Sequence, residues 1–155
     1  MTEDRSAVEI VPMRPEHLEK LAEVERLCFS EPWTVQGLAE EIENPLAVFL
    51  VAELDGVTVG YAGMYHVLDE GYLTNVAVDP GFRRRGAARA LLDWLDGYAQ
   101  KKSLQFITLE ARVSNRPAIA LYHASGYREQ GIRPGFYANP REDAVIMTKF
   151  YDSTK

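Results

Sequence analysis

The sequence predicts an α+β fold, with a mostly antiparallel sheet and one strand–helix–strand crossover near its middle. Three observations support this. The chain has 155 residues, of which 46% are hydrophobic and 26% charged, typical of one globular domain with its own core. Short apolar runs separated by turn residues occupy residues 47–78. Helical periodicity follows in the segment that begins at Gly86. We expect a single domain over residues 1–155, with its core at about residues 8–150.

The first half is predicted to hold one strand, two helices and a three-stranded meander. A short strand covers residues 8–13, and Pro12 places it near an edge of the sheet. A helix follows from Pro15, with Leu18, Leu21, Ala22, Glu25 and Cys28 at helical spacing. A second helix should run from Thr34, a plausible N-cap, to about residue 43. The meander strands are expected at residues 47–53, 57–68 and 72–78, with turns at residues 55–56 and 69–71.

The second half is predicted to alternate helices and strands. Gly86 opens a helix that carries Leu91, Trp94 and Leu95 on one face. A strand at residues 104–112 and a helix at residues 115–124 follow, and Gly126 is a candidate left-handed cap. The last two strands are expected at residues 127–132 and 144–150, joined by a loop that contains Pro134, Gly135, Asn139 and Pro140.

The charge is unevenly distributed along the chain. Lys and Arg number 17 and Asp and Glu 23, and the net charge of −6 argues against a protein that binds nucleic acid over its whole surface. Residues 16–55 hold ten acids and two bases, a local −8, whereas residues 81–102 hold six bases and two acids, a local +4. This asymmetry indicates partners or ligands of opposite sign, although two solvated helix faces would produce it as well.

The number of cysteines, the positions of the histidines and the hydropathy pattern exclude several classes of protein. Cys28 is the only cysteine, which excludes an internal disulfide and a cysteine-rich zinc site, and it fits a core position better than a nucleophile. The three histidines are scattered, so we expect no metal. Residues 1–6 are polar, unlike a signal peptide, and no apolar run approaches the about 18 residues that span a membrane. A cytoplasmic protein with no membrane contact is therefore expected.

The strand, loop and helix at residues 76–92 form the most informative segment. A helix N-terminus presents unpaired backbone N–H groups and the positive end of the helix dipole. Gly86 and Ala88 leave this backbone accessible, and the arginines of the loop add charged donors. The segment matches neither a Walker loop nor the three-glycine dinucleotide pattern. It therefore indicates a site for a pyrophosphate, the alternative being a basic surface turn without a ligand.

The same residues carry a resemblance to a known family. The pattern Arg83-x-x-Gly86-x-Ala88, after the strand NVAVDP at residues 75–80, resembles the acetyl-CoA-binding signature of GNAT-superfamily N-acetyltransferases. The segments LEARVSN at residues 109–115 and IRPGFY at residues 132–137 resemble the RimI subfamily, the ribosomal-protein alanine N-acetyltransferases. The resemblance covers about residues 8–150. It implies the GNAT fold, with a splayed parallel strand pair in the central sheet and about four helices.

The resemblance implies acetyl-CoA as the co-substrate, without a metal. The loop that would hold its pyrophosphate consists of Arg83, Arg84, Arg85, Gly86, Ala87, Ala88 and Arg89. The pantetheine arm would pair with the backbone of Val76, Ala77 and Val78 and would receive a hydrogen bond from Asn115. For the side chains of the three strand residues, simple burial remains the alternative.

The resemblance also assigns catalytic and acceptor-binding roles. Glu110 would be the general base and Tyr122 the general acid that protonates the leaving sulfur. Without the family context, Glu110 would be a strand carboxylate paired with Arg112, and Tyr122 a core aromatic. The acceptor would bind at the mouth of a groove formed by Glu25, Phe29, Trp33 and Tyr137. For Phe29 and Trp33 a hydrophobic plug under the second helix is the alternative.

The expected reaction is acetylation of a protein N-terminus, with the N-terminal alanine of small-subunit ribosomal protein number eighteen as the acceptor. An α-amine of pKa about 7.7–8.0 is neutral in about a tenth to a fifth of molecules at pH 7, whereas a lysine is neutral in about one of a few thousand. The alternatives are a GNAT enzyme for lysine or small amines and a non-catalytic acetyl-CoA sensor. An RNA-binding module is disfavoured by the negative net charge. We expect a monomer or weak dimer that does not bind nucleic acid.

Overall fold

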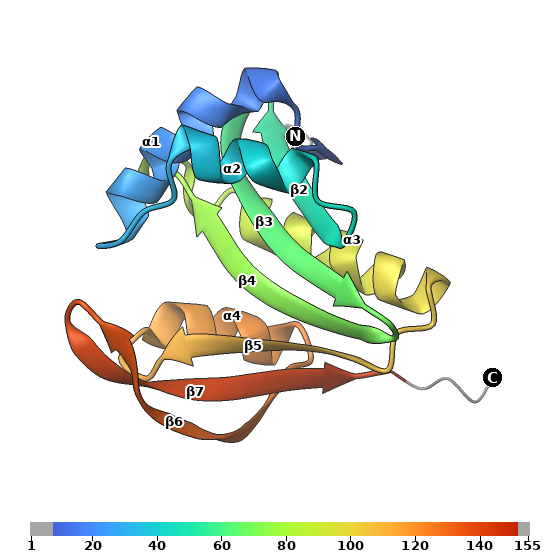
Figure 1. The fold of residues 1–155 in the computed structure, drawn as a ribbon, viewed down its shortest axis with the longest axis vertical. Helices are drawn as coiled ribbons and strands as arrows, with labels where there is room; N and C mark the ends of the chain where they lie inside the picture. The colour runs from blue at the N-terminus through green and yellow to red at the C-terminus, as the bar shows by residue number, and fades with distance from the viewer. Residues whose placement is uncertain (1–7, 152–155) are drawn as a thin grey trace, which may run out of the picture.

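A computed structural model describes residues 8–151, and the polar segment 1–6 lies outside these residues. The described part contains one seven-stranded sheet of order β1-β2-β3-β4-β5-β7-β6 and four α-helices (Figure 1). The strands are β1 (Val8–Pro12), β2 (Ala47–Leu54), β3 (Val57–Val67), β4 (Glu70–Val78), β5 (Phe106–Arg112), β6 (Arg128–Ala138) and β7 (Arg141–Phe150). The helices are α1 (Leu18–Cys28), α2 (Val35–Ile42), α3 (Ala87–Lys101) and α4 (Arg116–Ala124), with short 3-10 turns η2 (Pro15–His17) and η3 (Pro80–Phe82).

Helices cover both faces of the sheet and define two cores. Helices α1 and α2 lie in front of β2–β4 in Figure 1, and Leu21, Val24 and Leu38 pack there against Val51 and Tyr61. Helices α3 and α4 lie behind the sheet, and the larger core on that side joins their apolar faces to β2–β5 and β7. The front face of β5–β7 has no covering helix in the described part of the chain.

The parallel pair at the centre of the sheet separates soon after it begins. Strands β4 and β5 are paired only where Glu70–Tyr72 meet Phe106–Thr108, and beyond this they diverge (Figure 1). A bulge at Thr74 interrupts the pairing of β4 with β3, and its Oγ1 donates a 3.0 Å hydrogen bond to the Gly63 carbonyl. Because bulges bend and twist the strand that carries them, Thr74 helps to turn β4 away from β5. The predicted splayed parallel pair in a mostly antiparallel sheet is thus confirmed.

Local signals placed most element boundaries correctly. The Thr34 hydroxyl caps α2 by accepting from the Gly37 N–H at 3.0 Å, and Asn115 caps α4 at the Ala118 N–H at 3.2 Å. Gly126 takes the left-handed conformation at φ 102°. The turn expected at residues 69–71 was misplaced, because β4 already begins at Glu70.

The final hairpin differs from its prediction. The expected loop is mostly strand, since β6 continues to Ala138 and only Asn139 and Pro140 separate it from β7. Proline and glycine suit an edge strand with a bulge, and β6 is such an edge. The register shifts between Arg133 and Tyr137, and the Gly135 N–H donates to Asp143 Oδ1 at 2.8 Å. Tyr137, at the end of this irregularity, lies beside Arg112, the last residue of β5.

Within residues 8–151, no helix is both long enough and apolar enough to cross a membrane. In the same part of the chain, no three histidine, cysteine, aspartate or glutamate side chains gather as metal ligands.

Candidate active site

The loop after β4 presents an accessible helix N-terminus. Asp79 accepts from the Gly81 N–H at 2.9 Å and pairs with Lys20 at 2.8 Å, and Lys20 lowers the pKa of Asp79 below its usual value. Gly86 is the N-cap of α3 at φ 85°, a conformation that strains residues with a Cβ. A Cβ at Gly86 would meet nothing within 4 Å, so the space above the helix end is open.

The arginines of this loop extend into solvent. Arg83, Arg84, Arg85 and Arg89 are exposed, whereas Ala87 is buried and can offer only its backbone. Arg83 also donates toward the Cys28 sulfur at 3.6 Å, and Arg89 pairs with Asp93 at 3.3 Å. The loop therefore combines exposed positive charge with free N–H groups, as an anion site requires.

Strand β4 turns backbone groups toward the gap between β4 and β5. The Asp79 N–H donates to the Val59 carbonyl at 2.8 Å, and Ala77 lies opposite Tyr61 in the same register. In an antiparallel pair, alternate residues direct their N–H and C=O groups to the partner strand. Val76 and Val78 therefore direct theirs away from β3, on the side where β5 has diverged.

The Val78 carbonyl already contacts one side chain. The Cys28 thiol donates to it at 3.4 Å, so the end of α1 lies against this backbone edge. Burial raises the pKa of the Cys28 thiol, which makes it a poor nucleophile, as expected.

Glu110 lies on the front face of β5, and Tyr122 belongs to the core behind the sheet. Leu109 and Ala111 point into the core under α3 and α4, so Glu110 between them points to the front face. Glu110 Oε2 is 3.2 Å from Arg133 Nε, which corrects the alternative that pairs Glu110 with Arg112.

Tyr122 is a buried member of the core behind the sheet, 8% exposed, with its ring 5.9 Å from that of Tyr127. Burial raises the pKa of Tyr122, with a smaller contribution from Tyr137. The Tyr122 hydroxyl is therefore protonated at neutral pH and able to donate.

Tyr137 interacts electrostatically with both Glu110 and Tyr122. Burial, and then the charge of Glu110, raises the pKa of Tyr137 to about 12. Because Tyr137 also contributes to the raised pKa of Tyr122, the three side chains share one electrostatic environment. The Arg112 guanidinium carbon lies 4.4 Å from the centre of the Tyr137 ring.

Glu25 does not lie at the mouth of the groove, and this expectation is corrected. Its side chain is fully buried. Glu25 accepts hydrogen bonds from the Tyr61 hydroxyl at 2.5 Å, the Asn75 amide at 3.1 Å and the Trp33 N–H at 2.9 Å. A carboxyl group with three donors around it is satisfied where it stands, so Glu25 anchors the α1–α2 loop to β3 and β4.

The α1–α2 loop holds Phe29 and Trp33 differently. Trp33 is partly buried, with its ring 5.9 Å from that of Phe49, as the hydrophobic-plug alternative predicted. Phe29 is 39% exposed at the end of α1 and remains available to a ligand.

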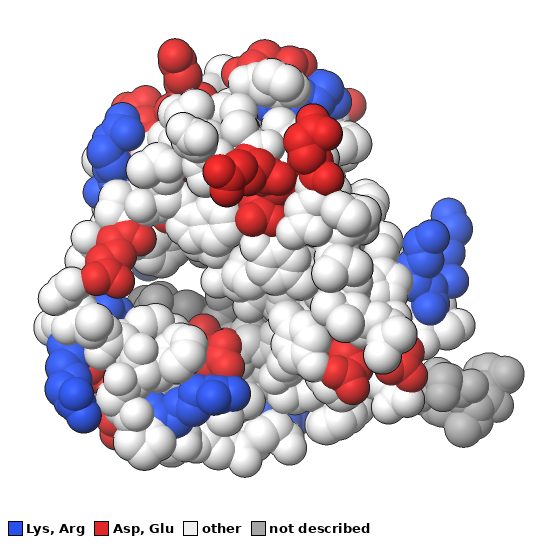
Figure 2. All heavy atoms as spheres, in the orientation of Figure 1, with Lys and Arg blue, Asp and Glu red and all other residues white. Residues whose placement is uncertain are grey.

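The same loop meets the β6–β7 turn across the gap. The Asn139 amide donates to Glu31 Oε2 at 2.5 Å, and the Ser30 hydroxyl donates to the Asn139 carbonyl. Figure 2 shows a hollow on this face between the part that carries α1 and α2 and the part that carries β5–β7. Sequence patterns did not identify Ser30, Arg112 or Asn139, because these contacts join segments far apart in the chain.

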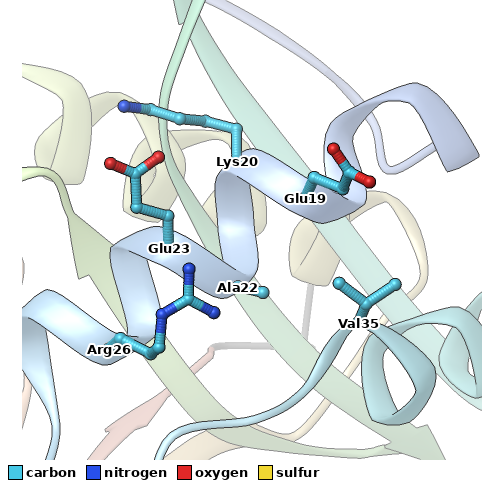
Figure 3. Close-up of a pocket in the computed structure, with 6 residues that line it drawn as sticks. All are labelled: Glu19, Lys20, Ala22, Glu23, Arg26 and Val35. Carbon is cyan, nitrogen blue, oxygen red and sulfur yellow. The ribbon is translucent and has the colours of Figure 1, made fainter.

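A second depression lies on the outer side of α1, with a volume of about 520 Å³. Its lining residues are Glu19, Lys20, Ala22, Glu23, Arg26 and Val35 (Figure 3). The charged side chains on α1 carry both signs, and none of the residues expected to bind or react belongs to this lining. We therefore place the candidate active site at the splay of β4 and β5.

The chain belongs to the acetyltransferase (GNAT) family, whose model matches residues 18–127, and is an enzyme of the N-acetyltransferase class. It is 36% identical over 126 residues to the [ribosomal protein bS18]-alanine N-acetyltransferase of Escherichia coli, covering 80% of this chain and 84% of that protein. The crystal structure of the Escherichia coli ribosomal-protein-S18-alanine N-acetyltransferase superposes with a TM-score of 0.84, at 30% identity over 96% of this chain and 99% of that one. PaiA N-acetyltransferase from Thermoplasma acidophilum, solved in complex with coenzyme A, shares the fold at a TM-score of 0.79 and 21% identity, over 94% and 99% of the chains. The resemblance stated from the sequence is thereby confirmed.

Proposed function

We propose that this protein transfers the acetyl group of acetyl-CoA to the N-terminal amine of a protein, with the N-terminal alanine of ribosomal protein bS18 as the acceptor. The observation that carries the proposal is the splay of β4 and β5, where Val76 and Val78 direct backbone groups away from β3 and β5 presents Glu110 on its front face. The names of the similar Escherichia coli proteins support the choice of acceptor.

The residues around the splay fit acetyl-CoA. Its pyrophosphate matches the exposed N–H groups of α3 and the arginines of the loop 83–89. An extended amide-bearing arm matches the outward N–H and C=O groups of Val76 and Val78, and Ala77 would contribute only to the shape of the strand. The Asn115 Oδ1 is engaged in capping α4, so its Nδ2 group would be the donor to that arm. Acetyl-CoA would supply the acetyl group as a thioester, from which the thiolate departs.

Glu110 would remove the proton from the attacking amine. Its carboxylate is partly exposed on the front face, where the acceptor would approach, and Arg133 holds it in place. Since about a tenth to a fifth of an α-amine is already neutral at pH 7, a carboxylate base needs to take only the proton released during attack. A direct transfer and one through a single water are both compatible with this placement.

Tyr122 would supply the proton to the departing sulfur from the opposite side of the sheet. Its raised pKa keeps the hydroxyl protonated over the whole neutral range, so the proton is available when the thiolate forms. The outward N–H of Val78 would stabilise negative charge on the carbonyl oxygen during attack.

The acceptor N-terminus would enter between the α1–α2 loop and the β6–β7 hairpin. Phe29 and Tyr137 would line this entrance, since both keep accessible surface, and Trp33 would support the loop from beneath. Glu25 would act only indirectly, through the position of Trp33.

The test is CoA release from acetyl-CoA with a peptide that begins with alanine, compared with the same peptide blocked at its N-terminus. Release only from the free peptide is expected. Glu110→Gln and Tyr122→Phe should each lower kcat by about 10²-fold or more, as for loss of a general acid or base. Glu129→Gln, on the exposed part of β6, is the matched control and should keep full activity. Release from the blocked peptide through a lysine, or full activity of both variants, would contradict the proposal.

A further inference from the structure

We infer that Arg112 is a positioning residue, which holds Tyr137 and the β6–β7 turn in the geometry that receives the acceptor. This inference deepens the proposed function and rests on it for its effect on turnover. Arg112 is the last residue of β5, two positions after Glu110 and on the same face of that strand. The strand that carries the proposed base therefore also carries the group that holds the facing hairpin.

The guanidinium of Arg112 contacts the hairpin through three hydrogen bonds and one aromatic ring. Nη1 donates to the Pro140 carbonyl at 2.8 Å and to Glu142 Oε1 at 3.1 Å, and Nη2 donates to the Asn139 carbonyl at 3.3 Å. The same guanidinium lies 4.4 Å from the centre of the Tyr137 ring. The Arg112 side chain thus holds the turn through hydrogen bonds to two carbonyls, and it holds Tyr137 through contact with the face of its ring.

These contacts need the shape of a guanidinium and not only its charge. A guanidinium offers several N–H donors in a rigid plane and can stack that plane on an aromatic ring. A lysine ammonium is a point charge on a flexible stem and cannot serve two carbonyls, a carboxylate and a ring at once. Arg112→Lys therefore keeps the charge and removes the geometry.

The turn passes this constraint on to the other side of the entrance. The Asn139 carbonyl accepts from both Arg112 and Ser30, and the Asn139 amide donates to Glu31. Glu142, the carboxylate partner of Arg112, also accepts from the Ser114 N–H at 2.8 Å. Hydrogen bonds through Asn139 thereby connect both walls of the acceptor entrance to Arg112 at the end of β5.

Hydrogen exchange of the free protein tests the inference without any acceptor. In Arg112→Lys, residues 136–142 should exchange faster than in the wild type, while residues 87–101 of α3 stay unchanged. Arg26→Lys, on the outer face of α1, is the matched control and should change neither segment. Unchanged exchange at residues 136–142 in Arg112→Lys would overturn the inference.

Steady-state kinetics then separate positioning from general damage. Arg112→Lys should raise KM for the alanine peptide about tenfold and leave KM for acetyl-CoA within about twofold. Tyr137→Phe should act in the same direction, and the double variant should fall short of the product of the two single effects. Multiplying effects, an unchanged peptide KM, or an equal rise in both KM values would overturn the inference. If the wild type acetylates no N-terminus, the proposed function fails and hydrogen exchange alone decides the role of Arg112.

Discussion

Replacing Glu25 with glutamine should destabilise the protein strongly, although the two side chains have nearly the same shape. Glu25 Oε1 accepts from the Trp33 N–H, and Oε2 accepts from the Tyr61 hydroxyl and the Asn75 amide. A glutamine has one acceptor oxygen, and its NH2 group must occupy one of these two positions. If the NH2 group faces Trp33, one donor loses its acceptor; in the other orientation two donors are affected.

The magnitude follows from the less costly orientation. A buried donor left without an acceptor costs about 1–3 kcal/mol, and the two retained bonds lose their charge-assisted character. We expect Glu25→Gln to lower the free energy of unfolding by about 2–4 kcal/mol, a large share of the about 5–15 kcal/mol that holds a typical domain folded. Because the carboxyl group anchors the α1–α2 loop, KM for the acceptor should rise while KM for acetyl-CoA changes little.

Urea unfolding at neutral pH measures this effect, with Glu23→Gln as the control. Glu23 is exposed on the outer face of the same helix (Figure 3). Its substitution should change stability by no more than about 0.5 kcal/mol. A loss below about 0.5 kcal/mol in Glu25→Gln would refute the account of Glu25 as a saturated buried acceptor.

Two further predictions concern backbone strain and pH. Gly86→Ala should cost about 1–2 kcal/mol of stability and raise KM for acetyl-CoA, because φ is 85° at this residue. Gly97→Ala, inside α3, should instead stabilise the protein by about 0.5–1 kcal/mol. Because a Cβ meets nothing within 4 Å at either position, thermal melts of the two variants measure the effect of backbone conformation alone. Stability should hold up to about pH 10 and fall above it, because the unfolded chain releases tyrosine protons near pH 10. The folded protein keeps the Tyr137 proton to about pH 12. An unfolding free energy that is equal at about pH 9.5 and about pH 11.5, on either side of the pKa of an unfolded tyrosine, would contradict this prediction.

The elements that the sequence predicts well are those specified by local contacts. Thr34 and Gly126 act at the helix ends where they were expected as caps, since a cap is decided by neighbours within three or four residues. The loop after β4 is equally local, because its arginines and Gly86 belong to one turn before one helix.

Contacts between distant segments were predicted less well. Glu25 shares the spacing of Leu21 and Ala22, and this pattern was a usable sign of burial that the acidic side chain obscured. The partner of Glu110 depends on the register of β5, β7 and β6, where Ile146 lies between Glu110 and Gly131. No local pattern could favour Arg133 over Arg112, because a register of three strands is set by their joint packing.

The candidate site lies where the pairing of β4 with β5 ends. Three residue pairs join β4 to β5, and past them Val76 and Val78 direct their backbone groups away from β3, toward the gap. Glu110 faces the front and Tyr122 the back, so the two partners of the proposed reaction would approach the gap from opposite faces. Such a site needs its walls held at a distance from each other, since the strands no longer bond across it. Glu25 fixes one wall from within the front core and Arg112 fixes the other from the end of β5, and Asn139 joins them at the entrance.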